Sequence, residues 1–149
     1  MILVVLIFSG CQTTKNFTSS QSKFKIGENS VSIVSGRFLQ SYSDILSTKV
    51  PARKIITGKL YLPKTCSVQK MPAVIIQHGS GHPKIAWYKK IAKAFNENGI
   101  IALVPDSMTS RGITETSKDQ SKLSKATRLY DTFSAFRFLQ EIECVEPSR

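Results

Sequence analysis

The clearest pattern in the chain is an apolar run that ends abruptly at a polar, glycine-rich turn. Ala73 to Ile76 are four consecutive apolar residues, three of them β-branched, and residues 77–82 read Gln-His-Gly-Ser-Gly-His. A short continuous apolar run predicts a strand buried on both faces, as in the middle of a parallel sheet. The two glycines of the turn let the backbone change direction sharply, because glycine adopts positive φ at little cost.

The residues after this turn predict a helix and a second buried strand. Pro83 opens the helix, which runs to about Asn98 and has its apolar residues at helical spacing, with a glycine just past its end: Tyr88, Ile91, Ala92, Phe95 and Gly99. Residues 100–104 are again continuously apolar and end at Pro105-Asp106. A strand, a helix and a strand in succession predict two parallel strands with the helix packed on their sheet.

On either side of this unit the pattern changes. Residues 31–35 and 54–63 mostly alternate apolar and polar, which is typical of half-buried strands at an antiparallel edge. After a polar loop, Thr116 and Asp119 fit a capping box for a helix to about Ile142. Its predicted buried face recurs at a helical period: Leu123, Ala126, Leu129, Phe133 and Phe136. The predicted fold class is α/β, a three-layer sandwich around a mixed, mostly parallel sheet.

Two motifs at the ends of the predicted parallel strands resemble a known family. They are His78-Gly79-Ser80-Gly81 after the first strand, and Pro105-Asp106-Ser107 with Arg111-Gly112 after the second. With the amphipathic helix between them, they look like the N-terminal half of the α/β-hydrolase fold, in particular the dienelactone hydrolase-like group. The likeness extends from about Gly58 to Arg149. It implies a carboxylic ester hydrolase that uses a nucleophile, an acid and a histidine.

In that family the loop after the third strand provides one backbone N–H of the oxyanion hole. The resemblance gives this role to Gly79 and Ser80, with His78 orienting the loop and Gly81 keeping it free of a side chain. A tight turn that binds no ligand is the alternative. A donor aimed at the developing oxyanion stabilises it without reorganisation, and losing one costs about 3 kcal/mol of barrier.

The catalytic triad itself is missing from the sequence. The nucleophile elbow needs glycines two residues before and two residues after its serine or cysteine, and none of the eight glycines has Ser or Cys two residues on. Ser80 has glycines only at the wrong offsets. In the family the histidine comes last, so neither histidine of this chain can be the general base. The sheet is expected to be truncated before the elbow, and this chain alone is predicted to be inactive.

Three further residues are candidates for the pocket. His82 either lines it or faces solvent. Asp106 and Arg111 follow the second parallel strand, at the edge where α/β sheets bind ligands. By resemblance they shape the pocket floor or bind each other, and an Asx turn with a structural ion pair is the alternative. No carboxylate or cysteine stands at metal-ligand spacing from the histidines, so neither a metal nor another cofactor is predicted.

Two cysteines come to the same end of the sheet if the strand order is that of the hydrolases. Cys66 precedes the third strand and Cys144 precedes the expected fifth, and these strands are neighbours in that fold. A disulfide is feasible there if the protein is exported, and two free thiols are the alternative.

The composition is that of a globular domain with a basic surface. The 149 residues are 41% hydrophobic and carry a formal net charge of +11. The lysines are scattered, without a dense block or interleaved aromatics, which argues against a nucleic-acid partner and favours a solvated surface. A single domain over residues 31–149 is expected, and a chain of this length can bury a sizeable core.

The N-terminal residues differ in kind. Met1 to Phe8 are wholly apolar and Ser9-Gly10-Cys11 follows, which resembles a bacterial lipoprotein signal with Cys11 as the lipidated residue. An apolar run this short does not span a bilayer, and a buried strand is the alternative. The polar residues 12–30 predict a flexible tether after the signal segment 1–11. The expected location is the bacterial cell envelope, on the periplasmic or extracellular face, with the membrane bound through the lipid anchor.

Two functions from different classes remain open. The first is the N-terminal part of a dienelactone hydrolase-like enzyme that acts on a small ester or lactone. The second is a non-catalytic, basic, membrane-anchored binding protein. The coding sequence beyond Arg149 separates them, because the enzyme requires an elbow motif within about fifteen residues.

Overall fold

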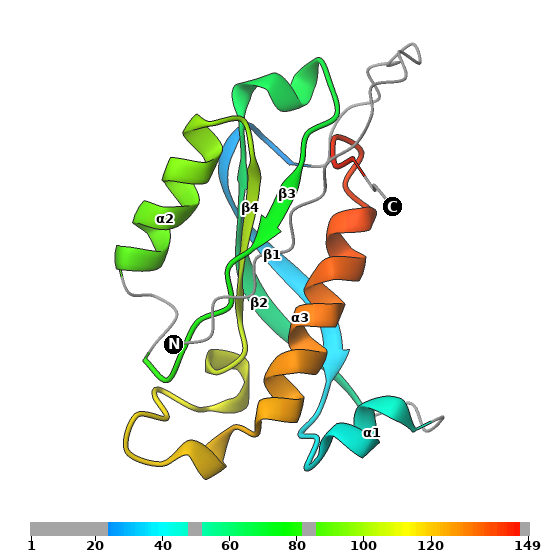
Figure 1. The fold of residues 1–149 in the computed structure, drawn as a ribbon, viewed down its shortest axis with the longest axis vertical. Coiled ribbons are helices and arrows are strands. Elements are labelled where there is room, and N and C mark those ends of the chain that lie inside the picture. The colour runs from blue at the N-terminus through cyan, green and yellow to red at the C-terminus, as the bar shows by residue number, and fades with distance from the viewer. Residues whose placement is uncertain (1–23, 48–51, 82–85, 147–149) are drawn as a thin grey trace.

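The computed structural model describes residues 24–47, 52–81 and 86–146. The strands are β1 (Gly27–Gly36), β2 (Arg53–Leu62), β3 (Ala73–Ile75) and β4 (Ile101–Asp106). The helices are α1 (Tyr42–Leu46), α2 (Ala86–Glu97) and α3 (Lys125–Gln140), with short 3-10 turns η1 (Lys64–Ser67), η2 (Thr109–Arg111) and η3 (Gln120–Lys122). The strands form one sheet in the order β1-β2-β4-β3 (Figure 1).

The sheet is mixed, which confirms the predicted α/β class. β3 and β4 are parallel, with Ala73 opposite Ile101, whereas β1–β2 and β2–β4 are antiparallel. The sequence predicted a mostly parallel sheet. In the described part, two of the three strand pairings are antiparallel. The long strands β1 and β2 account for the difference, because they pair antiparallel along β1 from Gly27 to Gly36.

A further segment lies against the outer edge of β3. The N–H of Met71 donates to Cys144 O at 2.8 Å, and Met71 O accepts from Glu146 N at 2.9 Å, which forms a parallel bridge with Val145. The next residue, Pro72, accepts on its carbonyl from Ile101 N of β4 at 2.9 Å. Adjacent residues of a strand point their backbone groups to opposite sides. Val145 therefore lies on the side of β3 away from β4.

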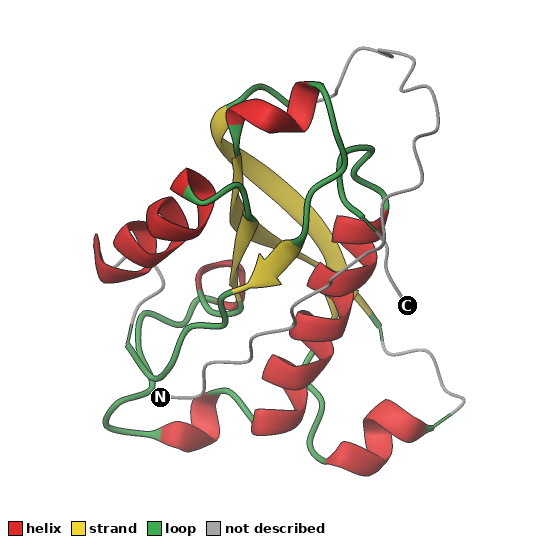
Figure 2. Ribbon diagram, turned by 45° about the horizontal axis from the view of Figure 1, so that its top comes forward, coloured by secondary structure: helices red, strands yellow, loops and turns green. Residues whose placement is uncertain are grey.

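Helices cover both faces of the sheet (Figures 1 and 2). On one face, α2 buries Tyr88 and Ala92 in a small apolar cluster with residues of β2, β3 and β4. On the other face, α3 closes a larger apolar core that includes Ile33, Leu60, Leu103 and Leu139. Burial of apolar surface on both faces explains why β3 and β4 read as continuous apolar runs.

The third helix begins later than the sequence predicted. Its N-cap is Ser124, whose Oγ accepts from Thr127 N at 3.0 Å. The predicted capping box at Thr116 is therefore wrong, and Asp119 instead caps η3 by accepting from a backbone N–H. The predicted apolar face is also wrong at Phe133, which is 47% exposed. The helix buries polar residues in its place: Thr127, Asp131, Thr132 and Ser134.

At the N-terminal side, β1 begins at Gly27, inside the stretch 12–30 that the sequence predicted as a tether. Four residues of that stretch pair with β2 and extend the sheet. The predicted signal segment 1–11, with Cys11, lies outside the described residues, and so does His82. Within residues 24–47, 52–81 and 86–146, no helix is both long and apolar enough to cross a membrane.

Cys66 and Cys144 form a disulfide, with their Cα atoms 5.3 Å apart. Cys66 belongs to η1, just before β3, and Cys144 directly precedes Val145. Both side chains are buried in the larger core. The bond therefore fastens the segment after α3 to the edge of β3.

Candidate functional site

The candidate site is the loop of residues 77–81, which leaves the C-terminal end of β3. It lies beside the loop that follows β4, because Ser107 N donates to His78 Nε2 at 3.1 Å. Both loops stand at the carboxyl ends of neighbouring parallel strands, which is the edge where α/β sheets bind ligands. The structure thus brings together the two motifs that the sequence singled out.

The contacts of His78 define its protonation state. Because Nε2 accepts the Ser107 N–H, it carries no hydrogen, and the ring proton is on Nδ1, which donates to Gly79 O at 2.9 Å. Burial lowers the pKa of His78, and the charge of Arg128 lowers it further; the Gly79 bond, Asp106 and Asp131 act in the opposite direction. The 1% exposed ring is therefore neutral and structural, with both nitrogens engaged.

The same contacts fix the backbone around Gly79. Its N–H donates to Tyr88 Oη at 2.8 Å, and its carbonyl accepts from the His78 ring. The carbonyl of Ser80 accepts from Thr116 N at 2.8 Å. In a trans peptide the C=O and N–H point in opposite directions, and the described chain has no cis peptide. The N–H of Ser80 therefore points away from the Gly79 carbonyl, and among the described residues it has no acceptor.

The two predicted oxyanion donors thus differ. Gly79 N–H is bonded to Tyr88, whereas Ser80 N–H has no acceptor within residues 24–47, 52–81 and 86–146. The hydroxyl of Ser80 is engaged elsewhere, since Ser80 Oγ accepts from Gln120 Nε2 of η3 at 2.6 Å. Gly81 is half-buried at the end of this described segment. The described contacts of the loop therefore leave the backbone N–H of Ser80 available for donation to a ligand.

Tyr88 is a site residue that the sequence analysis missed. It was placed only on the apolar face of the predicted helix, and it is indeed buried, at 6% exposure. A buried tyrosine hydroxyl needs a hydrogen-bond partner. That requirement, applied to a tyrosine in the first turn after a glycine-rich loop, is the signal that points to a contact with the loop.

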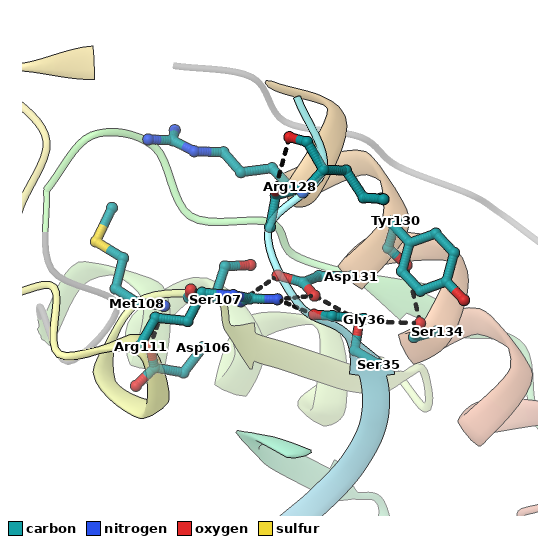
Figure 3. Close-up of polar contacts among 12 residues, drawn as sticks. Ser35, Gly36, Asp106, Ser107, Met108, Arg111, Arg128, Tyr130, Asp131 and Ser134 are labelled. Carbon is teal, nitrogen blue, oxygen red and sulfur yellow. Dashed lines mark hydrogen bonds and ion pairs between the residues drawn. The ribbon is translucent and has the colours of Figure 1, made fainter. Parts of the chain in front are cut away.

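Arg111 does not bind Asp106, and it lies in the interior rather than on a pocket floor. Its guanidinium forms a bidentate ion pair with Asp131 of α3, at 2.8 and 2.9 Å, and the two side chains are 1% and 0% exposed (Figure 3). It also donates from Nη1 to Ser107 O and from Nη2 to Gly36 O, each at 2.7 Å. This contact is a structural ion pair, the alternative that the sequence left open, but its partner Asp131, near the centre of α3, was not identified from the sequence.

Asp106 forms the Asx turn that the sequence analysis gave as the alternative to a pocket role. Its Oδ1 accepts from Met108 N and Thr109 N, both at 2.9 Å, which forms an Asx turn into η2. It also lines a cleft of about 600 Å³ between α2 and the β1–β2 pair. In its hydrogen bonds with described residues, Asp106 therefore has a structural role.

The far end of this cleft carries a cluster of charges. Glu28 accepts from Lys59 at 3.2 Å and from Lys89 at 2.9 Å. The bond to Lys89 lowers the pKa of Glu28. Burial, together with Glu28, raises the pKa of Tyr61 to about 12. No group of three His, Cys, Asp or Glu side chains in the described ranges is placed to hold a metal ion.

Fold and site together define a mixed α/β domain with a hydrogen-bonded backbone loop at the end of its short parallel strand. Comparison of the chain with protein-family models and with curated proteins finds no match. A functional assignment therefore depends on the geometry of the loop and on the motif resemblance.

Proposed function

We propose that the chain is the N-terminal part of a dienelactone hydrolase-like carboxylic ester hydrolase, and that Ser80 N–H is one donor of its oxyanion hole. The observation that carries this proposal is the N–H of Ser80, which has no acceptor in the part of the chain that the structure describes and lies between backbone groups that are held by hydrogen bonds. Both carbonyls that flank this N–H, those of Gly79 and Ser80, are hydrogen-bonded. Such a preorganised donor lowers the barrier to acyl transfer, because it does not have to reorient as charge develops.

The topology supports the same proposal. In the α/β-hydrolase fold, the fifth strand lies beside the third, and the nucleophile follows it. Here Val145 already bridges Met71 at the outer edge of β3. A parallel strand that continued from Val145 would end at the same edge of the sheet as Ser80, and would bring a nucleophile close to the loop.

The reaction follows from these positions. A serine or cysteine beyond Arg149 would attack the ester or lactone carbonyl, while a downstream histidine takes its proton and an acid orients that histidine. The carbonyl oxygen becomes an oxyanion and accepts from Ser80 N–H and from the N–H of the residue after the nucleophile. Collapse expels the alcohol, which takes the proton from the histidine, and water then hydrolyses the acyl-enzyme.

The disulfide supports an exported protein, because disulfides persist in oxidising compartments and are rare in the cytosol. The proposed location is the bacterial cell envelope, with Cys11 as the lipid-anchored residue. Under this proposal the substrate is a small ester or lactone outside the cytoplasm.

Two measurements test the proposal. The coding sequence after Arg149 is expected to contain G-x-S-x-G or G-x-C-x-G within about fifteen residues. In the protein that includes this motif, Ser80→Pro removes the N–H and is expected to lower kcat for a simple aryl ester by about 100-fold. Proline is compatible with the backbone in one respect, since no described non-glycine residue has positive φ.

The matched control is Ser80→Ala, which keeps the N–H and is expected to retain most of the activity. Equal losses in the two variants would contradict the role of the N–H. A stop codon after Arg149, or hydrolysis by the 149-residue chain that Ser80→Ala abolishes, would contradict the proposed division of the site. The stop codon would favour the non-catalytic binding protein.

A further inference from the structure

We infer that the buried ion pair of Arg111 and Asp131 is a positioning device for the Ser80 N–H, which acts through Ser107 and His78. The role given to the Ser80 N–H rests on the proposed function. The chain of contacts is independent of it, because each link is a hydrogen bond between described residues. The pair is a buried charged group for which the proposed reaction has no other use.

The first link joins the ion pair to Ser107. Asp131 holds the guanidinium of Arg111 in a bidentate fork, and Arg111 Nη1 donates to Ser107 O at 2.7 Å. On the other side, Ser35 Oγ donates to Asp131 Oδ1 at 2.5 Å, and Gly36 O accepts from Arg111 Nη2. A planar guanidinium with acceptors on both terminal nitrogens has a single orientation. The Ser107 carbonyl is therefore fixed relative to α3 and to the end of β1 (Figure 3).

The second link joins Ser107 to His78. Ser107 is fully buried, and its own N–H is the donor to His78 Nε2. A second route from α3 reaches the same residue. Thr132 Oγ1 donates to Gln77 Oε1 at 3.1 Å, and Gln77 Nε2 donates to Ser107 Oγ at 3.3 Å. Ser107 is thus held at its carbonyl, its hydroxyl and its N–H.

The third link joins His78 to the donor itself. With Nε2 occupied, the ring carries its proton on Nδ1 and donates to Gly79 O. Gly79 O and Ser80 N–H belong to one peptide plane and point in opposite directions. A change in the tautomer or tilt of the ring therefore changes the direction of the Ser80 N–H. A buried ion pair adds little net stability over apolar side chains of similar volume, so a positioning role accounts for its presence better than stability does.

The test uses the double variant R111M/D131L, which removes both charges without leaving one buried alone and is expected to fold. The readout is the tautomer of His78, from the ring ¹⁵N chemical shifts in a long-range ¹H–¹⁵N spectrum. The chain has only two histidines, so the His82→Gln variant identifies the His78 signals. In the parent chain we expect the two ring nitrogens to be widely separated, with the proton on Nδ1. In R111M/D131L we expect that separation to collapse toward a tautomer average.

The matched control is Ser134→Ala. It removes the contact from Ser134 Oγ to Ser35 Oγ at 3.2 Å, on the side of the pair away from Ser107, and should leave the His78 signals unchanged. Arg111→Lys is the second test variant. It keeps the charge, but one ammonium cannot hold Ser107 O, Gly36 O and Asp131 in the guanidinium geometry, so a partial collapse is expected.

A single Nδ1–H tautomer retained in folded R111M/D131L would overturn the inference, and so would one retained in Arg111→Lys if the double variant does not fold. Neither outcome depends on hydrolysis. A failure of the aryl-ester test therefore bears on the proposed function, whereas a failure here bears on the positioning device.

Discussion

The two long helices hold the sheet by different chemistry. Helix α2 buries only Tyr88 and Ala92 among its twelve residues, and its other contacts with the sheet come from half-buried apolar side chains. Helix α3 buries seven of its sixteen residues, and four of the seven are polar: Thr127, Asp131, Thr132 and Ser134. Helix α2 is therefore mainly an apolar cover, whereas α3 adds buried polar contacts to its part of the larger apolar core.

The polar residues of α3 each reach a different part of the chain. Thr127 Oγ1 accepts from Leu39 N at 2.9 Å, Thr132 donates to Gln77, and Ser134 donates to Ser35. Buried polar groups are almost always hydrogen-bonded, so these partners have to be in place when the helix packs. The comparison teaches that α2 packs on the sheet mainly by apolar contacts and reaches the candidate site through Tyr88, whereas α3 holds several segments around the site through buried polar side chains.

The largest expected loss of stability comes from removing the Cys66–Cys144 disulfide, which follows the C-terminal end of α3. Cys66 and Cys144 are 78 residues apart, and a cross-link of that span restricts the unfolded chain by about 4 kcal/mol in the loop-entropy description. The variant C66A/C144A is therefore expected to lose about 4 kcal/mol of unfolding free energy in urea titration. The parent protein in reductant is the control and should show a similar loss. A loss below about 1 kcal/mol would mean that the α3 layer does not depend on this bond.

A smaller effect tests the difference between the helices directly. Asp131→Asn leaves the buried Arg111 without a counter-charge and is expected to cost about 3 kcal/mol of unfolding free energy. The counterpart on α2 is Tyr88→Phe, which removes the hydrogen bond that the Tyr88 hydroxyl accepts from Gly79 N and is expected to cost about 1 kcal/mol. Equal costs in chemical denaturation would remove the distinction between the two helices.

The same difference explains which elements could be predicted from the sequence. The apolar runs of β3 and β4 and the apolar period of α2 are local signals, and the structure places these elements close to the predicted ranges. The face of α3 cannot be read in this way, because its buried residues are chosen by partners elsewhere in the chain. An apolar period favoured Phe133, which is exposed, and overlooked Asp131, which is fully buried.

The candidate site divides along the same line. His78, Gly79 and Ser80 follow one another in a motif, so the sequence identified them. Their hydrogen-bond partners lie far away in the sequence: Thr116 is 36 residues from Ser80, and Ser107 is 29 residues from His78. Those contacts arise only when the loops after β3 and β4 meet at one edge of the sheet. The sequence therefore predicts the donor, and tertiary packing determines its orientation.

The smallest effect concerns a proton on His78, at the point where the two helix layers meet. Its ring contacts Ser107, which α3 holds, and Gly79, which α2 holds through Tyr88. Burial is the main cause that lowers its pKa below the ordinary value of 6.5. Charges face the ring from α3, through Arg128 and Asp131, and from β4, through Asp106.

The sign follows from that lowered pKa. At a pH between 6.5 and the lowered pKa, His78 binds a proton in the unfolded chain but not in the folded chain. The contribution of His78 to stability is therefore complete above 6.5, declines as the pH falls toward the lowered pKa, and declines no further below it. Urea titrations of the parent and of His78→Asn, from about pH 7.5 to about pH 5.5, should differ in slope in that window, because the parent loses its His78 contribution as the pH falls and the variant has none to lose. Parallel curves would show that the ring accepts a proton as readily in the folded chain as in the unfolded one. The Ser107 bond would then not hold the tautomer, and the two layers would meet at the site without being coupled through it.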